Sequence, residues 1–155
     1  MSEPTSAAAT FAAVFVALYV AHQVADHWIQ TQHQAVHKAA PGWLGRRACA
    51  GHVAAYTATA LVALLALPLC LGLALDPARV VAGLLVSAVT HYAADRRTPL
   101  RRLAELLGNG GYLAAATVVR KPHGEAEHTG PGTALFELDQ SFHYLFLFAA
   151  ALIIA

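Results

Sequence analysis

Charge is scarce in this chain. Asp, Glu, Lys and Arg supply only 12% of its 155 residues, whereas 57% are apolar. An average soluble domain has about a quarter charged residues, so an ordinary cytosolic domain is excluded. The formal net charge of +1 gives no field that attracts nucleic acid, and no such partner is expected. Cys49 and Cys70 are too few for a disulfide framework. Glycine-rich phosphate loops and serine or cysteine nucleophile motifs are also missing.

The chain does contain four long apolar runs, at about residues 7–30, 48–75, 77–97 and 133–155. Each reaches the roughly 20 residues that cross a bilayer as a helix. The fold class predicted is therefore all-α: an integral membrane four-helix bundle forming one transmembrane domain over residues 1–155. No basic segment precedes the first run, which predicts a retained helix rather than a cleaved signal.

A shorter amphipathic stretch lies between the third and fourth runs. Its leucines follow one helical stripe, at positions 100, 103, 106 and 107. Thr98 and Pro99 suit the cap and first turn of a helix, and the glycine-rich stretch 108–111 suits its end. We predict a short interfacial helix in the last cytoplasmic loop.

The basic residues predict the orientation. Arg79 stands alone on one side of the four spans. The other side carries Lys38, Arg46, Arg47, Arg96, Arg97, Arg101, Arg102, Arg120 and Lys121. Positive residues mark the cytoplasmic side, so a multi-pass protein of the inner (cytoplasmic) membrane with both termini outside is expected. Besides the lipid bilayer itself, the arginine cluster predicts anionic lipid headgroups as partners.

Titratable residues within these spans follow a repeated spacing. The pairs His22/Asp26, His91/Asp95 and Asp139/His143 are each four residues apart, and a fourth histidine stands at position 52. That spacing places both members of a pair on one helix face. The predicted topology brings all seven groups to a similar depth near the cytoplasmic side. Because ionisable groups in membranes face the interior of a bundle, we expect them to share one cavity.

Four imidazoles and three carboxylates form a ligand set that suits a divalent transition metal. Zinc is the first choice, with iron, manganese or nickel as alternatives. The predicted ligands are His22, Asp26, His52, His91, Asp95, Asp139 and His143. Seven ligands leave room for one or two ions, and Gln30, Gln140 and Lys38 are expected to support them. A purely structural network that locks the helices together remains the alternative.

The order and spacing of these polar residues resemble those of an uncharacterised family of small prokaryotic and phage membrane proteins, the domain of unknown function 3307. The resemblance covers nearly the whole chain. His27 departs from it, since an aromatic residue is usual there, but this departure leaves the ligand pattern intact. The resemblance implies that the family's shared polar positions are His22, Asp26, Gln30, Lys38, His52, His91, Asp95, Asp139, Gln140 and His143. His/Asp-rich helices also make the chain distantly similar to small membrane proteins described as metal-dependent hydrolases.

Three functions fit these residues. The first is a metal-dependent hydrolase at the cytoplasmic membrane face, in which Asp26 or Asp139 takes a proton from water. The second is a transporter or sensor of a metal ion or proton, which the apolar outer halves of the spans disfavour. The third is a structural or partner-recruiting membrane subunit of a mobile element. A homo-oligomer is compatible with all three.

Overall fold

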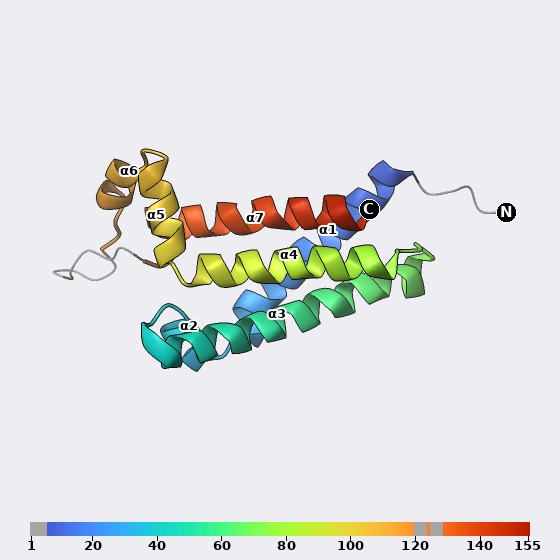
Figure 1. Cartoon of the computed structure of the whole chain (residues 1–155), viewed down its shortest axis with the longest axis horizontal. Helices are drawn as coiled ribbons and strands as arrows, with labels where there is room; N and C mark the ends of the chain where they lie inside the picture. The colour runs from blue at the N-terminus through green and yellow to red at the C-terminus, as the bar shows by residue number, and fades with distance from the viewer. Residues whose placement is uncertain (1–5, 120–123, 125–128) are drawn as a thin grey trace.

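The computed structural model describes residues 6–119, 124 and 129–155, and every regular element within them is a helix (Figure 1). The all-α prediction is confirmed. The basic residues Arg120 and Lys121 lie outside the described part of the chain. In chain order the elements are α1 (Ala7–Val24), the π-helical turn η1 (Ala25–Ile29), α2 (Gln32–His37), α3 (Gly42–Leu71), α4 (Pro77–Asp95), α5 (Thr98–Leu106), α6 (Gly110–Ala115) and α7 (Ala134–Ile154).

Local capping signals set the ends of the long helices. Ser6, Asp76 and Thr133 each accept a first-turn backbone N–H through a side-chain oxygen, at the starts of α1, α4 and α7. Pro77 follows its cap in the first turn of α4, where a missing N–H costs nothing. At the end of α3, Gly72 adopts a left-handed conformation with a φ of 66°, which glycine tolerates best.

Within the described residues, three helices are long and apolar enough to cross a membrane. They cover Ala7–Ile29, Gly42–Leu71 and Ala134–Ile154. The predicted third span corresponds to α4, which has 19 residues but is less apolar because Arg79, His91 and Asp95 fall within it. Length and composition therefore support membrane insertion for three of the four predicted spans.

Two sequence-based boundaries differ from the structure. The segment between the first two predicted spans, residues 31–47, contains α2 and the first turns of α3. Thr31 and Gln34 form a reciprocal capping box that starts α2. The helix predicted from residue 98 onward is α5, but its cap is Arg97 rather than Thr98. Charged residues such as Arg46 do not interrupt α3. The helix therefore begins before the charge-free run from which the second span was predicted.

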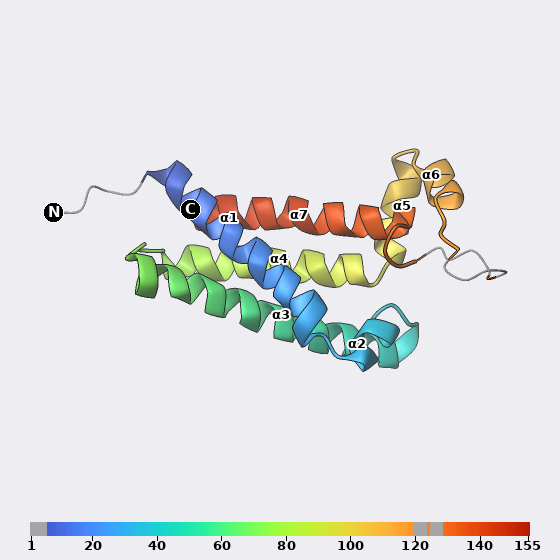
Figure 2. The ribbon, with the colours of Figure 1, turned by 180° about the vertical axis from the view of Figure 1, so that it is seen from behind.

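The long helices pack side by side. α4 contacts α3 and α7, and α1 contacts α3 and α7. Figure 2 shows α1 crossing the other long helices obliquely on one face. The apolar core between them includes Val14, Leu18, Leu64 and Leu147. α2, α5 and α6 gather at one end of the molecule, opposite the start of α1 and the end of α7 (Figure 1).

Gly83 is the point of close approach between α4 and α7. A Cβ atom there would lie 2.5 Å from Cγ1 of Ile154 and 3.0 Å from the carbonyl oxygen of Ala150. Gly83→Val is therefore expected to lower the free energy of unfolding by about 1–3 kcal/mol through overpacking. Thermal unfolding in detergent measures this change. Ala82→Val on the exposed side of α4 is the matched control, and equal stability of the two variants would contradict the packing described.

Candidate metal centre

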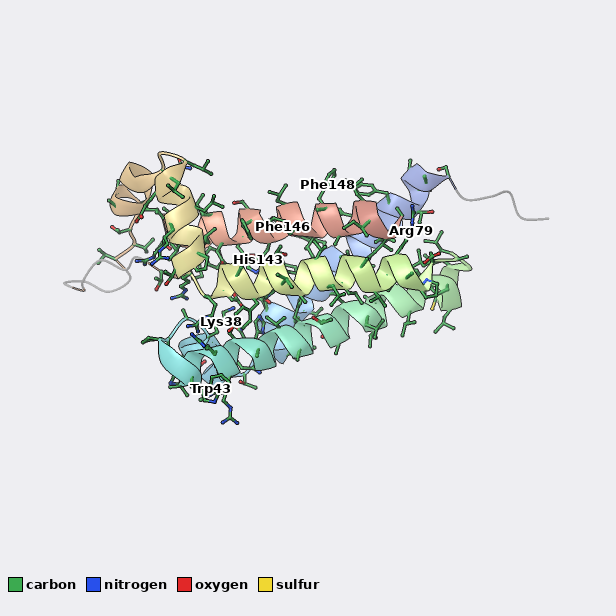
Figure 3. All side chains as sticks on the ribbon, viewed as in Figure 1. Lys38, Trp43, Arg79, His143, Phe146 and Phe148 are labelled. Carbon is green, nitrogen blue, oxygen red and sulfur yellow. The ribbon has the colours of Figure 1, made fainter. Side chains whose placement is uncertain are left out.

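Seven His and Asp side chains from four helices and the π-helical turn converge toward the end of the molecule that carries α2 and α5. Figure 3 places His143 and Lys38 toward this end and Arg79 at the opposite one. The four histidines and Asp95 are at most 4% exposed, although ionisable groups are rarely buried so completely without partners. The seven residues are His22 on α1, Asp26 on η1, His52 on α3, His91 and Asp95 on α4, and Asp139 and His143 on α7.

Two imidazoles and two carboxylates form the tightest group, which we call the four-residue cluster: Asp26, His52, His91 and Asp95. The Nε2 atoms of His52 and His91 are 3.0 Å apart. Nε2 of His52 lies 3.2 Å from Oδ1 of Asp26 and 3.4 Å from Oδ2 of Asp95. Nε2 of His91 lies 3.8 Å and 3.4 Å from the same two oxygens. Four ligand-type atoms from three segments, η1, α3 and α4, therefore face one another.

These separations match a metal coordination shell. Ligands at about 2.0–2.1 Å from a tetrahedral zinc ion lie roughly 3.3–3.4 Å from one another, and the five separations given above span 3.0–3.8 Å. Oδ1 of Asp26 and Oδ2 of Asp95 make no hydrogen bond among the described residues, although both are buried. Buried oxygens without partners are rare, and a cation placed among the four atoms would satisfy both.

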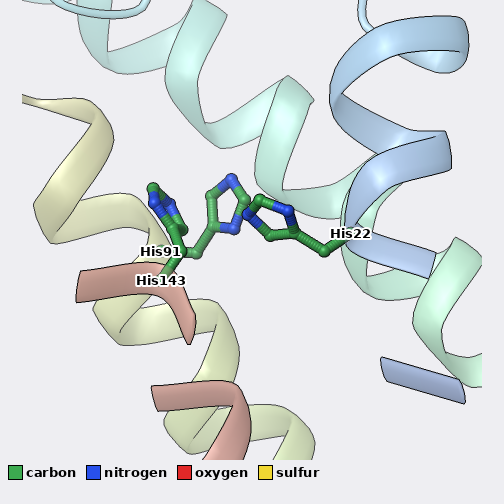
Figure 4. Close-up of side chains that lie close together, drawn as sticks. All are labelled: His22, His91 and His143. Atoms are coloured by element: carbon green, nitrogen blue, oxygen red, sulfur yellow. The ribbon is translucent and has the colours of Figure 1, made fainter. Parts of the chain in front are cut away.

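A second group of imidazoles adjoins this cluster. Figure 4 shows His22, His91 and His143 with their rings close together, and each offers a nitrogen within 4.8 Å of the others. Nδ1 of His143 donates to the carbonyl oxygen of Asp139 at 2.7 Å, and its buried Nε2, an acceptor in this tautomer, makes no hydrogen bond with any described residue. An orienting bond of this kind is typical of metal-ligating histidines. Both ring nitrogens of His22 are buried and likewise make no hydrogen bond within the described part of the chain.

Lys38 supports the four-residue cluster from the turn between α2 and α3. Its Nζ atom lies 2.8 Å from Oδ1 of Asp95, which leaves Oδ2 facing the imidazoles. The guanidinium of Arg96 donates to the carbonyl oxygens of Lys38 and Ala40, at 2.7 Å and 2.8 Å. The turn is thereby tied to the end of α4, so Lys38 is held against Asp95.

The two predicted glutamines take different positions. Nε2 of Gln140 is 3.4 Å from Oδ2 of Asp139, and Oε1 of Gln140 accepts from the hydroxyl of Tyr144 at 3.2 Å. Gln140 therefore contacts a candidate ligand directly. Nε2 of Gln30 is buried and makes no hydrogen bond among the described residues. The amide nitrogen of Gln30 is therefore not bonded to any candidate ligand.

Tyr56 and Ser87 form the inner wall of the site and were missed by the sequence interpretation. The ring of Tyr56 stacks on His91 at a centroid distance of 4.2 Å, and its hydroxyl is 2.5 Å from Oγ of Ser87. The signal was present, because Tyr56 follows His52 by four residues and Ser87 precedes His91 by four. Both therefore lie on the helix faces that carry the histidines.

The turn that carries Asp26 departs from ordinary helix geometry. Residues Ala25–Ile29 form a π-helix between α1 and the turn before α2. Single π-helical turns are rare and occur frequently at functional sites. Here the turn presents Asp26 to His52 while Nε2 of His22 stays 3.6 Å from Oδ2 of the same carboxylate.

A cavity of about 210 Å³ opens beside the centre. Asp26, Asp95 and Asp139 line it together with Gln30, Lys38, Arg97, Gln140 and the stretch 129–131. The side chains of Asp26 and Asp139 are 11% and 19% exposed, so both carboxylates are within reach of a small molecule. The arrangement therefore joins buried imidazoles to an accessible, carboxylate-bearing chamber.

Comparison with protein families assigns the chain. The family described as "Protein of unknown function (DUF3307)" matches residues 14–155. The chain belongs to this family. The match confirms the resemblance drawn from the polar residues, and the family description carries no activity. No curated protein and no solved structure matches the chain, so its function has to follow from the geometry of the centre.

Proposed function

We propose that this protein is an integral membrane, metal-dependent hydrolase that acts at the cytoplasmic membrane face. The observation that carries the proposal is a pair of buried carboxylate oxygens, on Asp26 and Asp95, that make no hydrogen bond among the described residues and face two imidazole nitrogens beside an accessible cavity. Buried groups of this kind are costly unless they bind something. An open chamber next to a metal-type ligand set is what a metallohydrolase requires.

Exposed apolar side chains support placement in a bilayer, including that of α4. Val81, Leu85 and Val89 recur every four residues on α4 and are 57–67% exposed. α3 and α7 expose similar rows, including Val62, Leu65, Leu145 and Leu152. Large contiguous apolar surfaces mark membrane contact. In this proposal α1, α3, α4 and α7 form a four-helix transmembrane bundle.

The end of the molecule near the centre is proposed to face the cytoplasm. α5 lies across the ends of the long helices (Figure 1) and exposes Leu103 and Leu106 beside Arg101 and Arg102. A helix with exposed leucines and arginines suits the interface between acyl chains and anionic headgroups. Arg79 is at the opposite end (Figure 3), in keeping with positive residues on the inner side and both termini outside.

The four-residue cluster is proposed to hold the ion. Its nitrogen and oxygen donors suit zinc, iron, manganese or nickel, and zinc is preferred because a set of four donors matches its usual tetrahedral coordination. His22, His143 and Asp139 would hold a second ion or orient the first. A divalent ion there supplies Lewis acidity and brings the pKa of a water close to neutrality. The residues of the chain bind the ion, exclude bulk solvent and accept the proton.

Asp139 is proposed as the proton acceptor. It lines the cavity and lies outside the four-residue cluster, whereas Asp26 turns Oδ1 toward His52 and His91. Gln140 contacts Oδ2 of Asp139 and so fixes the carboxylate. Asp26 is therefore proposed chiefly as a ligand of the ion. Its partly exposed carboxylate is the second candidate for the proton acceptor.

Transport through this chain is less well supported than hydrolysis. Among the described residues, the buried polar side chains between the long helices end at the pair Tyr56 and Ser87, and the core beyond them contains Val14, Leu18 and Leu64. An ion pathway needs polar groups across the whole membrane. A metal relay or a structural subunit of a mobile element would share the centre but would show no turnover.

The test is hydrolysis by detergent-purified, zinc-loaded protein against a panel of phosphoesters and short-chain lipid esters. Asp139→Asn is expected to lower the turnover number about 10²–10⁴-fold, the usual contribution of a general base, while the zinc held by the four-residue cluster, to which Asp139 does not belong, is retained. Glu137→Gln, two residues earlier and exposed, is the matched control and should retain full activity. Zinc-loaded wild-type protein that turns over none of these esters would refute the hydrolase assignment.

A further inference from the structure

Resting on the proposed function, we infer that the cavity beside the four-residue cluster contains a subsite for a phosphoryl group, formed by Arg97 and Gln30. Both side chains line the 210 Å³ cavity. Both present N–H groups, and a guanidinium is a pure hydrogen-bond donor. The ligand they favour is therefore an anionic acceptor, and the substrate class is a phosphoester.

Arg97 is held at the cavity by an unusual backbone conformation. Its φ is 58° and its ψ is −40°, and it is the one non-glycine residue with positive φ in the described part of the chain. The backbone N–H of Thr98 bonds to the carbonyl oxygen of Arg96 at 2.6 Å, so Arg97 is the centre of a γ-turn of the rare, strained type. Residues with strained backbone conformations cluster at active sites and ligand-binding sites.

The donors of this subsite lack partners within the chain. The Arg97 side chain is partly buried, yet its guanidinium makes no hydrogen bond or ion pair with any described residue. Nε2 of Gln30 is buried and likewise makes no hydrogen bond there. Lys38, the other cation lining the cavity, is already paired with Asp95 at 2.8 Å. Two donors thus remain for a ligand, and Arg97 provides the geometry that suits phosphate oxygens.

The charges around the cavity make anion binding depend on the metal ion. Asp26, Asp95 and Asp139 oppose Lys38 and Arg97, which leaves one formal negative charge in excess. A divalent ion reverses the balance to one positive charge. We therefore expect a phosphoryl group to bind when the centre is loaded and to be repelled when it is stripped.

Equilibrium binding of inorganic phosphate to detergent-purified protein tests the subsite, with zinc content measured on the same samples. Zinc-loaded wild-type protein should bind phosphate at least about tenfold more tightly than chelated protein. Arg97→Gly suits a positive φ and should preserve the fold. It should keep normal zinc content but lose about tenfold or more in phosphate affinity. Arg97→Lys should lose less, and Arg101→Ala, which removes an exposed charge one turn later, should bind as the wild type does.

The outcomes distinguish failure of the phosphoryl subsite from failure of the proposed hydrolase function. Normal zinc content with equal phosphate affinity in the wild type and Arg97→Gly overturns the subsite and leaves the hydrolase standing. Failure of the wild type to take up zinc overturns both. Glycerol 3-phosphate and dihexanoyl phosphatidic acid, compared as competitors, distinguish a soluble phosphoester from a lipid headgroup, since tighter binding of the lipid identifies the membrane as the source.

Discussion

His91→Ala is expected to abolish metal binding and every metal-dependent activity with it. Nε2 of His91 lies 3.0 Å from the facing nitrogen of His52 and 3.4 Å from Oδ2 of Asp95, and the residue belongs to two of the three groups of ligand-type residues found among the described residues. Loss of even an orienting partner of a metal ligand lowers metal affinity about 10–100-fold. Removal of a ligand shared by two groups should exceed that range.

Metal content and affinity are the measurements. Purified wild-type protein and His91→Ala are loaded with zinc, dialysed and analysed by elemental analysis, and affinity is then obtained by competition with a chelator. His33→Ala is the matched control because it removes an exposed imidazole on α2, outside the centre. Equal zinc content in His91→Ala and the wild type would exclude the four-residue cluster as the site. Absence of zinc from both would identify the cluster as a structural polar network.

The convergence of the seven polar residues could be predicted from the sequence, because it follows from a short-range spacing that recurs in several helices. A separation of four residues places His22 with Asp26 on one face, and the same spacing recurs in α4 and α7. The balance of basic residues supplied a common depth for these pairs. A membrane location predicts that faces of this kind meet one another, because exposing ionisable groups to lipid is costly.

The sequence could not predict contacts that depend on exact backbone geometry. The pairing of Lys38 with Asp95 requires the turn between α2 and α3 that Arg96 holds in place. No periodic pattern encodes that turn. The positive φ of Arg97 and the π-helical turn at Asp26 likewise arise from tertiary packing that overrides local preference. These three exceptions all lie at the centre, where local and global preferences most often conflict.

Removal of the Lys38 ammonium is expected to have the largest effect on stability. In metal-free protein, Lys38→Met leaves the Asp95 carboxylate, which is 1% exposed, without its charged partner. Breaking a buried ion pair by removing one member costs about 3–5 kcal/mol, chiefly because the remaining charge is left unpaired. Chemical or thermal unfolding in detergent, with a chelator present, should show this loss. Arg47→Met, which removes an exposed positive charge from the same end, should change stability by no more than about 0.5 kcal/mol.

A double-mutant cycle identifies the cause of that loss. If the unpaired carboxylate is responsible, Asp95→Asn in the Lys38→Met background should recover most of the lost stability, because the amide carries no charge. Zinc should also narrow the gap between Lys38→Met and the wild type, since the ion offers Oδ2 of Asp95 a positive partner in place of the ammonium at Oδ1. A Lys38→Met variant as stable as Arg47→Met, with or without zinc, would mean that the 2.8 Å contact contributes nothing. In that case Lys38 would not be the group that holds Asp95 against the imidazoles.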